Sequence, residues 1–134
     1  MLFDFDITIP AHTTQLNPVE QIVTLTHGTL TDIRVMFPPG PATLVHVTVR
    51  DRLHQLVPAN QDGTLNFDDT TISSRMEHPM LDAPYELVIT GWSPNAVYEH
   101  TVTCQFDMQP AAGDTWVEFN EQLFNLVDPR QRDA

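Results

Sequence analysis

Lysine is absent from this sequence, and cysteine and glycine are scarce, with one cysteine and five glycines in 134 residues. Because Cys104 is alone, no internal disulfide can form, which excludes the disulfide framework of small secreted domains. Five glycines supply no glycine-rich loop of the kind that cradles phosphate groups. The sequence therefore excludes both a disulfide-stabilised fold and a glycine-rich phosphate-binding loop.

Positive charge is also scarce. All six basic residues are arginines, and they face 18 acidic residues, so the net charge is -12. Nucleic-acid affinity depends on clustered positive charge, and anionic membranes attract the same kind of surface. We therefore expect neither nucleic acid nor membrane as a partner.

Long apolar runs are missing as well. No run approaches the roughly 18 residues that a membrane-spanning helix needs. Residues 1–6 have neither the basic region nor the apolar region of a signal peptide. We expect a protein that is made in a cytoplasm and used as made, with a length suited to one domain and one core.

Alternation of apolar and polar side chains with period two is the main pattern that is present. Residues 3–9 and 98–108 show it most clearly, with Phe3 to Ile9 and Val102 to Met108 as the apolar sets. Further strands are expected over about 21–27, 30–37, 43–50, 53–57 and 85–92. Residues 64–83 are expected to hold at most a short strand pair, with an irregular loop over 76–82. The inward faces of the strongest strands are predicted to carry Val47, Leu87, Ile89, Val102 and Phe106.

Seven or eight short strands separated by proline and glycine turns are typical of a β-sandwich or barrel. The strand count and the long middle loop favour a jelly roll, with an immunoglobulin-like sandwich as the alternative. We therefore predict an all-β fold with one jelly-roll-like sandwich or barrel over residues 1–110. A C-terminal arm over 111–134 is expected to follow it.

The C-terminal arm has a different pattern. Thr115 and Glu118 have the spacing of a capping box, which predicts a short amphipathic helix over 115–127, with an added strand as the alternative. The apolar stripe of this helix consists of Trp116, Phe119, Leu123 and Leu126. A helix this short is marginal alone in water. We therefore expect the stripe to form an interface with a neighbouring subunit, or else to pack on its own sandwich.

Metal and cofactor sites are not predicted. The six histidines have no local ligand spacing, although His46 and His54 could approach each other from neighbouring strands. Residues 60–69 have oxygen-bearing side chains spaced as in a calcium loop. However, the first ligand position falls on Pro58, and the flanking segments are expected strands. A polar hairpin loop is the preferred interpretation, and no cofactor is expected.

Catalytic and sugar-binding arrangements are equally weak. Cys104 falls on the apolar face of an expected strand, where a free cysteine is usually buried and inert. No G-x-S-x-G nucleophile motif occurs. Trp92 and Tyr98 flank one hairpin turn, where they could form a sugar platform or simply close the core. We predict no catalytic residues and no enzyme.

Three segments carry a resemblance to a known group of proteins: ITIPAHT at 7–13, LTDIRVMFPPG at 30–40 and HQLVPAN at 54–60. With these segments the chain resembles the small single-domain β virion proteins of bacteriophages, which include capsid decoration (cement) subunits and small jelly-roll capsid proteins. The likeness covers roughly residues 3–108 and lies in strand order rather than in a diagnostic motif. The helix-like tail after residue 110 departs from it.

The resemblance implies a non-enzymatic structural protein that acts through protein–protein contacts. It implies a virion location after assembly in the host cytoplasm, the major capsid protein as a partner, and a homo-oligomer, most often a trimer. It supplies no catalytic residues. The alternative is a carbohydrate- or receptor-binding β-sandwich.

Overall fold

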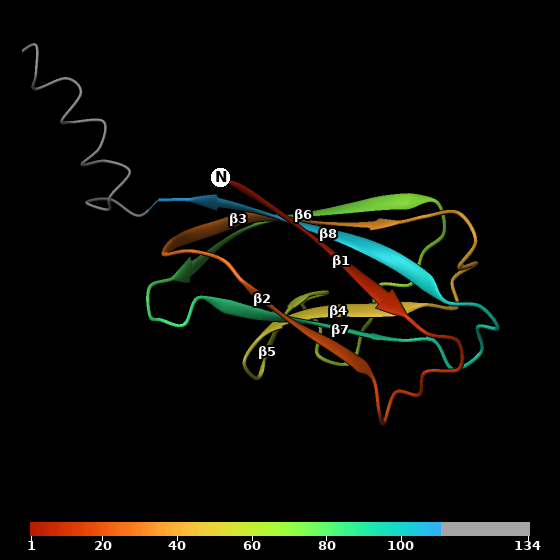
Figure 1. Ribbon diagram of the computed structural model, residues 1–134. Coiled ribbons are helices and arrows are strands. Elements are labelled where there is room, and N and C mark those ends of the chain that lie inside the picture. The colour runs from red at the N-terminus through yellow and green to blue at the C-terminus, as the bar shows by residue number, and fades with distance from the viewer. Residues whose placement is uncertain (111–134) are drawn as a thin grey trace, which may run out of the picture.

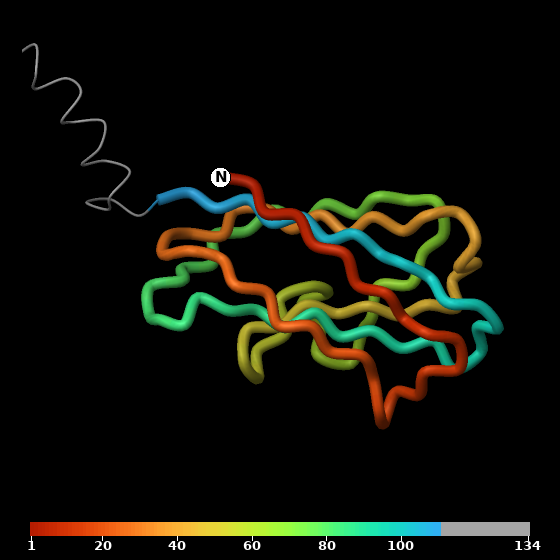
Figure 2. Tube along the Cα trace, viewed as in Figure 1, coloured from red at the N-terminus to blue at the C-terminus, as the bar shows by residue number. Residues whose placement is uncertain are grey.

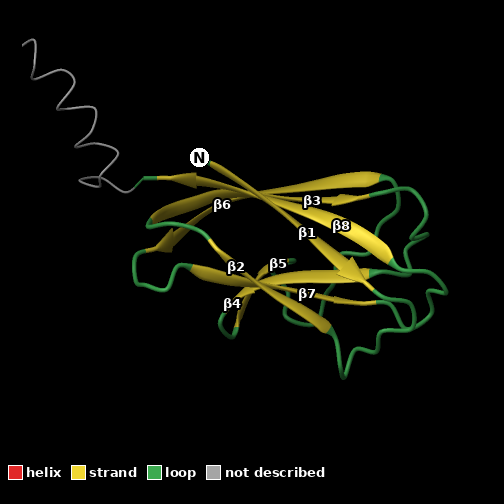
Figure 3. Ribbon diagram, in the orientation of Figure 1, coloured by secondary structure: helices red, strands yellow, loops and turns green. Residues whose placement is uncertain are grey.

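The computed structural model describes residues 1–110, which form eight β-strands in two facing layers (Figure 1). The strands are β1 (Leu2–Ile9), β2 (Val19–Thr24), β3 (Gly28–Phe37), β4 (His46–Asp51), β5 (His54–Val57), β6 (Thr70–Met80), β7 (Glu86–Trp92) and β8 (His100–Gln109). The first sheet has the order β1-β8-β3-β6 and the second has the order β2-β7-β4-β5. Figure 3 shows the two sheets as stacked layers joined by loops at both ends.

The strand pairing is that of one long hairpin that has been rolled up. β4 pairs with β5, β3 with β6, β2 with β7 and β1 with β8, all antiparallel. Rolling then brings β3 beside β8 and β4 beside β7, which completes the two sheets. Figure 2 shows the result, with the red N-terminal strand running beside the blue C-terminal one. This is a jelly-roll sandwich, so the predicted fold class is confirmed and the immunoglobulin-like alternative is wrong.

The core lies between the sheets and is built from the alternating apolar positions of the strands. The five side chains predicted to face inward, Val47, Leu87, Ile89, Val102 and Phe106, have no exposed surface. Gly91 marks a close approach between the layers, because a Cβ there would lie 2.4 Å from Cδ1 of Ile9 in the opposite sheet. A glycine inside a strand is expected where another element comes this near.

The loop expected over residues 76–82 is an error of the sequence analysis. Residues 70–80 form β6, which at 11 residues is the longest strand that the structure describes. Two of its inward positions carry Ser74 and His78, so the apolar alternation that identifies a strand is interrupted. Pro79 also argues against a central strand, but β6 is an edge strand, where a proline is tolerated.

The predicted helix over 115–127 lies outside the described residues, as does the whole arm 111–134. Among residues 1–110, no helix has the length and apolar character that crossing a membrane requires.

The assignment of inward and outward faces is testable on β8. Phe106→Ala should lower the free energy of unfolding by about 3–5 kcal/mol, because a fully buried ring is lost from a closed core. Thr103 lies on the outer face, where its Oγ1 donates to Asp6 Oδ1 over 2.7 Å, so Thr103→Ala should cost under about 1.5 kcal/mol. Chemical denaturation of both variants checks this, and equal costs would contradict the assigned faces.

Candidate functional site

A β-bulge in β3 interrupts the outer face of the first sheet. The register of β3 shifts between Leu30 and Asp32 against both of its neighbours, β6 and β8. As a result, Thr31 and Asp32 are consecutive half-buried residues, and the alternation of the strand breaks there. Bulges re-aim side chains and are over-represented beside binding and active sites. The outer face around this bulge is therefore the first candidate site.

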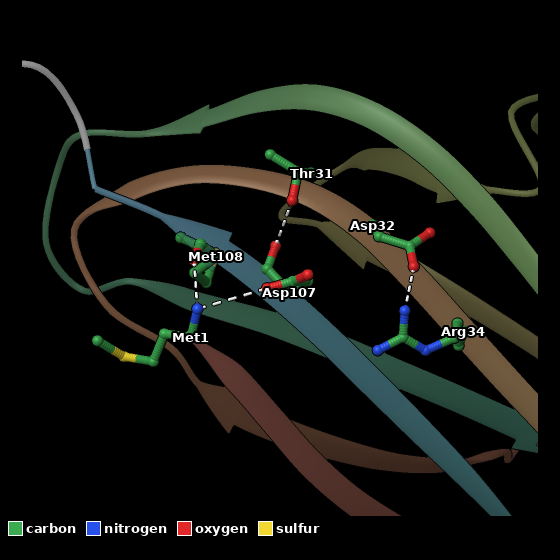
Figure 4. A network of polar contacts seen from close by, with 6 residues as sticks. All are labelled: Met1, Thr31, Asp32, Arg34, Asp107 and Met108. Carbon is green, nitrogen blue, oxygen red and sulfur yellow. Dashed lines mark hydrogen bonds and ion pairs between the residues drawn. The ribbon is translucent and has the colours of Figure 1, made fainter.

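A row of polar side chains crosses three strands at the bulge. The Arg34 guanidinium donates to the Asp32 carboxylate, and Figure 4 shows the two side chains side by side. Arg34 Nε also donates to Gln105 Oε1 over 3.3 Å, and Gln105 Nε2 donates to Asp4 Oδ1 over 3.2 Å. Charge of both signs is thus held in a fixed order across β3, β8 and β1.

The N-terminal amine joins the same face. The Met1 amine donates to the backbone oxygen of Met108 over 2.8 Å and lies 3.4 Å from Asp107 Oδ1 (Figure 4). Thr31 Oγ1 donates to the backbone oxygen of Asp107 over 3.1 Å. These contacts fasten the start of β1 and the bulge to the end of β8.

A depression of about 600 Å³ lies beside the bulge, between β3, β6 and β8. Asp32 and Arg34 line it from β3, and Ser73 and Arg75 line it from β6. Asp32 Oδ1 is buried there without a hydrogen-bond partner among the described residues. The lining carries arginines, carboxylates and hydroxyl groups, which suit polar recognition.

A second depression, of about 380 Å³, lies between the edge strands of the two sheets, β5 and β6. At its end, His78 Nε2 on β6 lies 2.7 Å from Asp51 Oδ2 on β4. The ring of His54 stacks on that of His78, with 6.4 Å between the ring centroids. The His78–Asp51 contact therefore ties the two sheets together where their edges are otherwise apart.

The approach of His46 and His54 that the sequence left possible does not occur. In the antiparallel β4–β5 hairpin, Asp51 lies opposite His54, so His46 falls at the far end of β4. His46 stacks instead on Trp92, with 5.7 Å between centroids and 11° between planes. Over residues 1–110, no three or more His, Cys, Asp or Glu side chains are grouped to hold a metal ion.

Trp92 and Tyr98, the two residues of the possible sugar platform, differ in their exposure to solvent. Trp92 is only 9% exposed and is covered by the core and by His46, as the core-closing interpretation predicts. Tyr98 is 74% exposed, in the loop between β7 and β8. A stacking platform made from both side chains is therefore not available.

The acidic loop between β5 and β6 has a structural use. Asp68 Oδ1 accepts hydrogen bonds from the backbone N–H groups of Gly40 and Ala42, each over 2.9 Å. Asp68, one of the oxygen-bearing residues of the possible calcium loop, thus binds the backbone of the loop between β3 and β4. Leu65 in the same segment forms an isolated bridge with Val47.

Cys104 is fully buried on β8, as predicted. Burial, reinforced by the nearby charges of Asp6 and Asp4, raises the pKa of its thiol to about 12. A thiol in this setting stays protonated and is not a nucleophile at neutral pH.

The interface predicted from the sequence, Trp116, Phe119, Leu123 and Leu126, lies outside the described residues. The bulge, its depression and the His54–His78 contact were not anticipated. A signal for the bulge was present in the two consecutive polar residues Thr31 and Asp32 between apolar Leu30 and Ile33.

No family model matches the chain, and no curated protein matches it in sequence. Among solved structures, a chain from the X-ray structure of tomato aspermy virus is similar in fold, with 13% sequence identity and a TM-score of 0.44. The match covers 84% of this chain and 81% of that chain. A likeness at this TM-score carries no argument about function.

The His46–Trp92 stack gives a pH prediction. Burial lowers the pKa of His46 below its ordinary value of 6.5. The unfolded chain therefore binds a proton on this ring at a higher pH than the folded chain does. The contribution of His46 to the free energy of unfolding should accordingly fall as the pH drops below 6.5, until the folded ring is protonated too.

The change His46→Gln should remove this part of the pH dependence in denaturation experiments on both proteins. An NMR titration of the His46 ring measures the same shift directly. A midpoint above the ordinary value would contradict the burial argument.

Proposed function

We propose that the protein is a non-enzymatic structural subunit of a virus particle, a capsid decoration (cement) or minor capsid subunit that acts through protein–protein contacts. The observation that supports it most is the eight-stranded jelly-roll topology, closed by the pairing of β1 with β8. Capsid proteins are one of the main groups built on this architecture, beside lectins and cupins. Fold alone does not assign function. The side chains of the interior and of the surface must therefore distinguish a capsid-like role from a lectin-like or a cupin-like one.

The interior supports a structural role over a cupin-like one. A site inside the sandwich would need polar side chains that converge on a cavity. The buried polar residues among those described are Thr48, Thr90 and Ser93, and the other core positions are apolar. Ser93 Oγ is engaged with the backbone oxygen of Pro10 over 2.9 Å, and Thr90 Oγ1 accepts from Arg50 over 2.8 Å. The side chains between the sheets thus form an apolar core and not a polar binding site.

The surface supports protein contacts over sugar stacking. Trp92 is covered, which leaves Tyr98 as a single exposed ring rather than half of a platform. The net charge of -12 opposes non-specific association of free copies and directs them away from a packaged genome. Assembly contacts must then be local and directional.

We further propose that the chain is a homotrimer, with the major capsid protein as its partner. The sequence feature behind the trimer is the apolar stripe Trp116, Phe119, Leu123 and Leu126 of the C-terminal arm. A stripe of this kind on a short helix is stable only when another surface covers it.

Mass spectrometry of purified particles of the virus that encodes this chain tests the proposal. We expect the chain at a fixed copy number relative to the major capsid protein, retained after washing at high salt. The control is a glycan array probed with the purified protein, on which we expect no binding. Absence from particles together with saturable binding to one glycan class would contradict a structural role and favour the sugar-binding alternative.

A further inference from the structure

We propose that β6 is a self-association edge, at which a second copy of this chain adds its own β6 antiparallel, with the two-fold axis at Met76. The contact would join the first sheets of two copies into one continuous sheet. It uses only residues of the sandwich and does not rest on the proposed virion role.

The position of β6 makes it available. It is the outermost strand of the first sheet and pairs with β3 alone. An edge strand of 11 residues presents C=O groups, and N–H groups except at Pro79, that no neighbouring strand uses. The other edge of this sheet, β1, carries Asp4 and Asp6 on its outer face, so pairing two copies of β1 would bring acidic groups together.

Pro79 shows which backbone groups of β6 face the free edge. Pro79 lies opposite Thr29, and proline has no N–H to give to β3. This must therefore be a non-hydrogen-bonded pair, with the backbone of Pro79 directed away from β3. The pairing with β3 has an extra residue of β6 between His78 and Arg75, but exposed and half-buried side chains alternate without a break along β6 from Thr71 to Pro79. Because a strand repeats every two residues, Ser73, Arg75 and Glu77 therefore also direct their N–H and C=O groups to the free edge.

The charges of β6 favour one register for self-pairing, because only the register centred on Met76 places Arg75 and Glu77 opposite each other. Arg75 and Glu77 are exposed and make no side-chain hydrogen bond or ion pair with another described residue. When Met76 lies opposite Met76 of the second copy, Arg75 lies opposite Glu77 of the second copy, and the reverse pair forms by symmetry. Both are hydrogen-bonded pairs in this register. Registers centred on Arg75 or on Glu77 place like charges opposite each other, which is destabilising.

The surface beside β6 leaves room for a strand. The depression of about 600 Å³ flanks β6 on the outer face of the first sheet. The depression of about 380 Å³ separates β6 from β5. Arg75 lines both and Glu77 lines the second, so the side chains of the proposed charge pairs border open space. On the inner side, the half-buried Met76 would be covered by its counterpart in the second copy.

Sedimentation and light scattering of the full chain at several concentrations test the contact. We expect a dimer of the 15.2 kDa chain, or a hexamer if the C-terminal arm also holds three copies together. Glu77→Arg places arginine opposite arginine and should halve that mass, as should Arg75→Glu. The double variant Arg75→Glu/Glu77→Arg restores opposite charges in the same register and should restore the mass.

The matched control is Glu99→Arg, which makes the same charge change in the exposed loop before β8, and its mass should equal that of the unaltered chain. Far-ultraviolet circular dichroism confirms that each variant is folded. An unaltered chain that is monomeric throughout, or single variants that keep its mass, would overturn the proposal. So would a double variant that stays at half mass. The particle-composition experiment is separate, so either proposal can fail alone.

Discussion

The pairing of β1 with β8 is the contact on which the rest of the structure depends. It runs without interruption from Leu2 opposite Asp107 to Ile9 opposite His100, and the Met1 amine extends it to the backbone oxygen of Met108. Joining segments this far apart in sequence has an entropic cost that local contacts cannot offset. The burial of apolar side chains offsets this entropic cost. From β8 the core receives Val102, Cys104, Phe106 and Met108. The roll and the core must therefore form together.

Closing the roll at β1 and β8 leaves the two sides of the sandwich unequal. On one side, β1 contacts β2 and β7 of the opposite sheet, and the connecting loops are bonded to each other through Thr13 and Ser93. On the other side, β5 and β6 are separated by a depression, and the His78–Asp51 contact ties β6 to β4. The open side is thus a consequence of the fold. It is also where the longest described strand has an unused edge.

The sequence predicted the elements that have one apolar face and one polar face. β1, β3, β7 and β8 were found because their inward positions are occupied by apolar residues almost throughout. β6 was missed because Ser74 and His78 occupy inward positions at the rim, where a polar side chain can reach a partner or water. No periodicity argument could have supplied the partner of His78, since Asp51 meets it only through the packing of two sheets.

The candidate surfaces were predictable to a smaller extent than the core. The consecutive polar residues Thr31 and Asp32 indicate a break in the alternation, but the register shift itself depends on the two neighbouring strands, whose order the sequence does not show. The charge pair on β6 is visible in the sequence as Arg75 and Glu77 two residues apart. It can predict a contact between copies only once β6 is known to be an edge strand. On a central strand, both sides are already paired within the same chain.

Backbone amide hydrogen exchange of the full chain, measured by NMR, tests most directly the claim that β6 is paired by β3 on one side and by a second copy on the other. The amides of Ser74 and His78 face β3 and should exchange slowly in both the unaltered chain and the Glu77→Arg variant. The amides of Ser73, Arg75 and position 77 face the free edge, so they should exchange slowly in the unaltered chain and rapidly in the variant. Rapid exchange of these three amides in the unaltered, associated chain would contradict the account.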